Sequence, residues 1–105
     1  MKHIHCSEAQ WYDAPELGLE GTQEMKLCIL SDDSVQIALG EGGHTPDHIH
    51  DDKERLVVIS GNGIIRFKTE QIEIRPDDFI EIDKEQHQIV NTGTAPLVFM
   101  AFRNQ

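Results

Sequence analysis

The sequence has few cysteines and no long apolar run, and each shortage excludes a class of protein. Cys6 and Cys28 are the only cysteines among 105 residues, too few for a disulfide framework, so we expect a reducing, cytoplasmic setting. No stretch approaches the roughly 18 apolar residues of a membrane-spanning helix. The N-terminal residues MKHIHCSEAQ are polar and lack the apolar segment of a secretory signal. We therefore predict a cytoplasmic protein with no membrane partner.

Basic residues are also scarce. Nine Lys and Arg residues stand against nineteen Asp and Glu, which gives a formal net charge of −10. Proteins that bind nucleic acid or anionic membranes neutralise phosphates with basic side chains, and the sequence contains no Lys or Arg cluster. An acidic surface can equally serve only to keep a small domain soluble. The charge therefore predicts that the protein has no nucleic-acid partner, and it indicates little else about function.

Helical periodicity is nearly absent, and short segments of strand character recur instead. In the segment IIRFKT, Ile65 and Phe67 alternate with Arg66 and Lys68, which is typical of a strand with one face in a core and the other in water. The GNG triplet at residues 61–63 is a strong hairpin signal. Strands are expected at residues 25–30, 34–39, 55–60, 64–69, 71–75, 79–83, 87–91 and 96–102. Short strands at this spacing predict an all-β, antiparallel sandwich or barrel.

The length suits one domain with a real core, because 38% of the residues are hydrophobic and 105 residues are too few for two domains. We predict a single domain over residues 1–105, with its core at about residues 25–103. An N-terminal extension, residues 1–24, is expected to pack on the barrel or pair with it. Residues 13–21 are the best helix or loop candidate, but one proline and two glycines make this segment a poor helix.

Residues 42–61, GGHTPDHIHDDKERLVVISG, contain three of the six histidines. If the chain is extended there, His48 and His50 point to the same face and can converge on one cation. Glu54 follows and opens an apolar strand, where a carboxylate is costly to bury unless it is paired or bound to a metal. The spacing therefore favours a metal site built from two imidazoles and one carboxylate.

A fourth ligand has to come from elsewhere, and His87 is the best candidate. It stands at the start of the predicted strand 87–91 and shares a face with Ile89. A lone histidine in such a position is more often a satisfied core or edge residue than a ligand. The local pattern leaves both interpretations open.

The histidine-rich stretch resembles the first signature motif of the cupins, G(X)5HXH(X)3,4E(X)6G. Gly42, His48, His50, Glu54 and Gly61 occupy every fixed position of that motif with the right spacing. Five fixed residues with the right spacings over twenty positions make the match specific.

The second cupin motif, G(X)5PXG(X)2H(X)3N, is only partly present. His87 and Asn91 fit it, whereas Pro76, Ile82 and Lys84 replace its Gly, Pro and Gly. The resemblance to the cupins covers approximately residues 40–100. The tight turn before the histidine is therefore replaced, but the histidine itself is retained.

The resemblance implies a small single-domain cupin, with an all-β antiparallel jelly-roll barrel, the double-stranded β-helix. It implies that His48, His50, Glu54 and His87 hold one divalent transition metal ion, and that two copies of the chain pair as a homodimer. Three imidazole nitrogens and one carboxylate suit Mn, Fe, Ni, Co, Cu or Zn better than Ca or Mg.

Function is less closely constrained by these motifs. The first hypothesis is a metalloenzyme that acts on a small chelating organic substrate by oxygenase- or isomerase-type chemistry, with Glu54 as a catalytic base. The alternatives are a non-catalytic module that binds or senses a sugar-like small molecule, and a barrel whose metal is purely structural.

The remaining chemically active residues carry weaker signals. His44 is expected at a pocket rim or on the surface, and the terminal group His3, His5 and Cys6 in a solvated or strand-paired segment. Cys28 is most simply a small core residue. The sequence nominates no substrate-binding cation, because the basic residues of the segment 64–69 alternate with core residues and are expected to face water.

Overall fold

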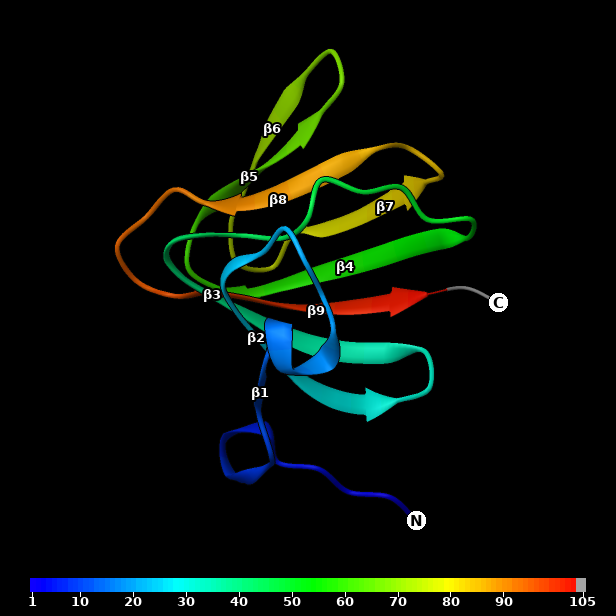
Figure 1. Ribbon diagram of the computed structural model, residues 1–105, viewed down its shortest axis with the longest axis vertical. Coiled ribbons are helices and arrows are strands. Elements are labelled where there is room, and N and C mark those ends of the chain that lie inside the picture. The colour runs from blue at the N-terminus through cyan, green and yellow to red at the C-terminus, as the bar shows by residue number, and fades with distance from the viewer. Residues whose placement is uncertain (104–105) are drawn as a thin grey trace.

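The computed structural model describes residues 1–103 and consists mainly of antiparallel strands in one curled sheet (Figure 1). Two short 3-10 helices, η1 and η2, lie near the N-terminus. In chain order the elements are η1 (Cys6–Glu8), β1 (Tyr12–Asp13), η2 (Ala14–Leu17), β2 (Gln23–Ser31), β3 (Ser34–His44), β4 (Lys53–Ser60), β5 (Gly63–Phe67), β6 (Gln71–Ile74), β7 (Phe79–Asp83), β8 (His87–Asn91) and β9 (Leu97–Arg103). The prediction of an all-β antiparallel fold is confirmed.

Most strands pair with partners that are distant in the sequence. The order across the sheet is β6-β5-β8-β3-β9-β4-β7, with β2 beside β3 and β1 beside β2. Within residues 1–103, only β2–β3 and β5–β6 form hairpins of more than two residue pairs between consecutive strands, and every pair of strands is antiparallel. The curled sheet brings β8 and β5 opposite β4 and β9, which is the jelly-roll arrangement (Figure 1).

The predicted strands all have observed counterparts, β2 to β9, and the differences lie at their ends. β3 continues to His44, past its predicted end, and bends on the way. Its first part pairs with β9, and His44 pairs instead with Val90 of β8. The side-chain amide of buried Asn91 donates to the carbonyls of Leu39, Gly40 and Ala95, each at 3.0 Å, and so ties the bend to the end of β8.

The predicted hairpin at Gly61-Asn62-Gly63 is wrong. β4 pairs with β7 and β9, whereas β5 pairs with β6 and β8, so the GNG triplet carries the chain between two halves of the sheet. The two glycines instead allow close contact between backbone segments. A Cβ on Gly61 would lie 2.2 Å from the Pro96 carbonyl oxygen, and one on Gly63 would lie 2.4 Å from the Val90 carbonyl oxygen. The backbones approach too closely for any side chain.

The core lies inside the curl and follows the alternation of each strand. On β4 the side chains of Leu56 and Val58 are buried, and on β9 those of Phe99 and Ala101. The N-terminal segment contributes as well, since β1 pairs with β2 and Ala14 of η2 is fully buried in this core. The segment that was a poor helix candidate thus forms a single 3-10 turn. No helix within residues 1–103 is long and apolar enough to cross a membrane.

Candidate metal centre

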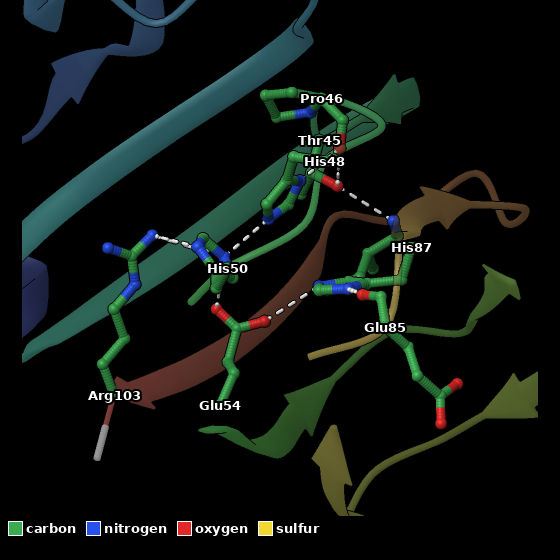
Figure 2. Close-up of polar contacts among 9 residues, drawn as sticks. Thr45, Pro46, His48, His50, Glu54, Glu85, His87 and Arg103 are labelled. Carbon is green, nitrogen blue, oxygen red and sulfur yellow. Dashed lines mark hydrogen bonds and ion pairs between the residues drawn. The ribbon is translucent and has the colours of Figure 1, made fainter. Parts of the chain in front are cut away.

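The four candidate ligands come from three separate parts of the chain and meet on one side of the barrel interior (Figure 2). His48 and His50 lie in the loop between β3 and β4, Glu54 lies on β4, and His87 begins β8. A pair of backbone hydrogen bonds joins the loop to β8, because His48 N donates to His87 O at 3.0 Å and His87 N donates to His48 O at 2.9 Å. This bridge sets the two imidazoles side by side.

The donor atoms are close enough for one cation to contact all four. Nε2 of His48 is 2.7 Å from Nε2 of His50, and the latter is 3.3 Å from Oε2 of Glu54. Oε1 of Glu54 is 3.0 Å from Nε2 of His87, and the four ligand atoms all lie within 4.8 Å of one another. Two ligands at right angles, each about 2.1 Å from a cation, are about 3.0 Å apart. The spacing and the donor set fit a transition ion.

Backbone carbonyls orient two of the imidazoles. Nδ1 of His48 donates to the Pro46 carbonyl at 2.5 Å, and Nδ1 of His87 donates to the Glu85 carbonyl at 2.8 Å. With the proton held on Nδ1, Nε2 is the nitrogen that can contact a cation, and backbone carbonyls orient histidine ligands in this way in many metal sites. Figure 2 shows both rings turned towards the shared point.

Glu54 and His87 form a buried pair. Burial raises the pKa of Glu54, but the hydrogen bond from His87 and the attraction of the neighbouring imidazoles outweigh it and leave the pKa below its ordinary value. Burial likewise lowers the pKa of His87, and the contacts with Glu54 and the Glu85 carbonyl outweigh it, so that this pKa is raised. Without a metal, the pair is therefore a carboxylate beside an imidazolium.

His50 has a different environment. Burial lowers its pKa most, Glu54 opposes this, and Arg103 and the other two imidazoles add to the lowering, so His50 is held neutral. Nη2 of Arg103 donates to Nδ1 of His50 at 2.6 Å. Because a guanidinium has no acceptor, Nδ1 carries a lone pair, and the proton of the neutral ring is on Nε2 in this arrangement.

Sequence reasoning missed Arg103, although a signal was present. Leu97, Phe99 and Ala101 alternate along β9 and are buried, and Arg103 continues the same parity. Its register partner is Glu54, and cross-strand partners share a face. The predicted strand ended at residue 102, one position too early to include this arginine.

A cavity of about 450 Å³ opens beside three of the four candidate ligands. His48, His50 and Glu54 line one part of it, and most of the remaining wall is apolar. The apolar lining includes Leu27, Val35, Ile37, Ile89, Phe99 and Ala101. A small organic molecule with an apolar part can therefore lie against the donor set.

The weaker candidates lie elsewhere. His44 is half-buried at the end of β3, where its Nδ1 is 3.0 Å from the Thr45 carbonyl oxygen, and it does not belong to the four-residue donor group. Nδ1 of His5 lies 2.8 Å from Ser7 Oγ in the exposed N-terminal segment. Cys28 is buried, and burial together with the neighbouring Cys6 thiol raises its pKa.

Comparison with known proteins agrees with this geometry. The family model for the cupin domain, Cupin_2, matches residues 35–103. The chain belongs to this family. No curated protein matches this cupin.

Solved structures share the fold of this cupin at low sequence identity. The polyketide cyclase RemF from Streptomyces resistomycificus superposes with a TM-score of 0.84 at 18% identity, covering 98% of this chain and 78% of that one. A predicted oxalate decarboxylase from Thermotoga maritima gives 0.77 at 19%, covering 97% of both chains. A sugar phosphate isomerase of the cupin superfamily from Silicibacter pomeroyi gives 0.78 at 16%, covering 99% and 76%. At these identities the likeness shows the fold alone.

Proposed function

We propose that this cupin is a metal-dependent enzyme whose small organic substrate chelates the metal. The observation that carries the proposal is the convergence of His48, His50, Glu54 and His87 on one point at the wall of a cavity large enough for such a substrate. A metal with only a structural role needs no cavity beside it, so the open wall favours a site that binds substrate. The family fold by itself does not select an activity.

The proposed cofactor is one divalent transition ion, Mn, Fe, Ni, Co, Cu or Zn. Three imidazole nitrogens and one carboxylate oxygen match these ions, whereas Ca and Mg prefer oxygen ligands. When bound, such an ion supplies Lewis acidity and, if it is redox-active, electron transfer to dioxygen.

The protein's own groups support proton transfer at a substrate carbon. Glu54 is held ionised by its imidazole neighbours, so its carboxylate can accept a proton from a substrate in the cavity. His87 donates a hydrogen bond to Oε1 and keeps the carboxylate in place. The apolar wall around Phe99 and Ile89 excludes water and strengthens these electrostatic contacts. We propose that Glu54 acts as the catalytic base when its carboxylate is released from the metal, in isomerase- or oxygenase-type chemistry.

Metal analysis of the wild-type protein and the His50→Ala variant tests the site. The wild type is expected to hold about one transition ion per chain, and His50→Ala to lose at least about tenfold in affinity because one direct ligand is gone. His44→Ala is the matched control, since His44 is also half-buried but lies outside the donor group. It should load metal as the wild type does.

The same variants separate the competing roles. An enzyme should lose turnover of small hydroxy acids, oxo acids or sugar phosphates in His50→Ala, while the metal-free proteins melt at similar temperatures. Binding of such compounds without turnover would instead support the sensing module. Equal metal content in His50→Ala and the wild type would overturn the site.

A further inference from the structure

The cavity lining includes a basic side chain, and backbone contacts fix the point from which it extends. Among the described residues, Arg103 is the only lysine or arginine that lines the cavity. Its backbone N–H donates to the Asp33 carbonyl at 2.9 Å, which anchors the end of β9 to the β2–β3 turn. Opposite it on β4 is Glu54, so the side chain of Arg103 starts from the interior face of the barrel.

The guanidinium lies against a candidate ligand rather than against an acid. Nη2 of Arg103 is 2.6 Å from Nδ1 and 3.3 Å from Nε2 of His50 (Figure 2). Within residues 1–103, no carboxylate lies within ion-pair distance of this guanidinium. Arg55 provides the contrast, because its Nε donates to Glu81 at 3.0 Å. Arg103 thus has donors available for a molecule in the cavity.

The contact with His50 also changes when Nε2 of that ring binds a cation. A neutral imidazole has one proton, and the arginine contact places it on Nε2, the nitrogen closest to the other ligands. Once Nε2 contacts a cation, the proton of the neutral ring is on Nδ1, which can no longer accept from Arg103. The guanidinium, which is exposed and lines the cavity, can then donate to water or to a molecule bound there.

The rest of the cavity defines what that acceptor is attached to. Asp32 and Asp33 also line the cavity, at the β2–β3 turn to which Arg103 is anchored, and the protein as a whole is acidic, so Arg103 is the fixed positive charge that an anion would meet among the described lining residues. An anion is therefore attracted to the space between Arg103 and the candidate metal centre. The wall near Leu27, Ile37 and Phe99 suits an apolar group. A planar carboxylate matches the fork of a guanidinium.

We propose that Arg103 is the substrate-binding residue that selects carboxylic acids with an apolar body. The carboxylate would lie between Arg103 and the candidate metal centre, and the apolar part along the wall formed by β2, β3 and β9. The inference deepens the proposed function, because it names the substrate class of the same site. It makes Arg103 a specificity-determining residue that contacts the substrate.

Calorimetric binding of 3-phenylpropanoate and of its neutral amide, 3-phenylpropanamide, to manganese-loaded protein tests this inference. Wild type is expected to prefer the acid, and Arg103→Gln to bind the acid about ten- to a hundredfold more weakly while binding the amide unchanged. Arg103→Lys should recover part of the preference because it restores the charge. Arg55→Gln is the matched control and should behave as wild type, since Arg55 pairs with Glu81 outside the cavity.

Metal content and melting temperature, measured on every variant, separate this inference from the proposed function. Unchanged acid binding in a folded, metal-loaded Arg103→Gln protein would overturn the role of Arg103 and leave the metal site standing. Wild type that does not distinguish the acid from the amide would overturn it as well. If the protein takes up no metal but still prefers the acid in a way that depends on Arg103, the anion site is upheld and the proposed metal-dependent enzyme is overturned.

Discussion

Among single residues, His87 has the most demanding environment. Its side chain is 1% exposed, with a carboxylate on Nε2 and a backbone carbonyl on Nδ1. Local sequence could not distinguish a ligand from an ordinary core histidine, because the decisive neighbours, Glu54 and His48, are more than thirty positions away along the chain. The structure brings these side chains together, and their distances make the histidine part of a donor group.

The raised pKa of His87 predicts that metal binding weakens as the pH falls. A cation binds the lone pair on Nε2, so the proton that Glu54 stabilises on that nitrogen has to leave first. Because this pKa lies above its ordinary value of 6.5, proton competition begins above pH 6.5 and strengthens below it. His50, whose pKa is lowered, adds little competition near neutrality.

Metal titrations at about pH 5 and about pH 7.5 check this expectation. Affinity should be at least about tenfold lower at the acidic pH, with about one proton or more released per ion when binding is measured in buffers of different ionisation enthalpy. Equal affinity at both values would argue against ligation by histidine.

Among the elements, the β4–β5 connection shows best how distant strands restrict a local segment. Gly61 has φ +83° and its backbone lies against the Pro96 carbonyl, so the turn depends on contact with the segment before β9. The sequence around Gly61 is typical of a hairpin turn. The two strands that it joins, β4 and β5, nevertheless form their hydrogen bonds with other strands and not with each other.

Gly61→Ala is expected to destabilise the protein more than Gly18→Ala. Both glycines have positive φ, so both substitutions cost about 1–2 kcal/mol of backbone strain. Only the Gly61 variant also forces a Cβ to 2.2 Å from a backbone oxygen, whereas nothing lies within 4 Å of a Cβ at Gly18. Denaturant unfolding should show a difference of about 2 kcal/mol or more between the two variants. Equal losses would mean that the packing at Pro96 relaxes freely.

For the molecule as a whole, the outer face of the curled sheet includes a partly exposed apolar row. Val57 on β4 is paired with Phe79 on β7 and with Met100 on β9, so the three side chains form one row. The neighbours of Val57 on β4 are buried, which places this row on the outside, and Phe79 is 62% exposed. The pairing of β9 with a strand on each side does not explain why its outer side chains are apolar. We propose that a second copy of the chain covers this outer row.

The Phe79→Asp variant tests the proposed homodimer. Wild type is expected to sediment as a dimer and the variant as a monomer, because a carboxylate buried at the interface would be unpaired. Leu17→Asp is the control, since Leu17 is also exposed, at 39%, but lies on η2 away from this row. A wild type that remains monomeric at micromolar concentration would contradict the proposal.

Cytoplasmic location and the absence of a nucleic-acid partner stay predictions.

The sequence by itself determined the strands and three of the four candidate ligands, because these depend on short-range patterns. Period-2 alternation predicts a strand without knowledge of its partner. The spacing of His48, His50 and Glu54, together with the family resemblance, was enough to nominate His87. These side chains also lie close together in the structure.

Tertiary structure alone decided which strands pair and what faces the cavity. Pairing of β4 with β9, rather than with β5, joins residues some forty positions apart, and no local pattern records such a contact. The place of Arg103 follows from that same register, since its pairing with Glu54 directs the guanidinium to the donor group. Burial of the core fixes the register, because a shift of one residue would turn every apolar side chain of a strand to the opposite face.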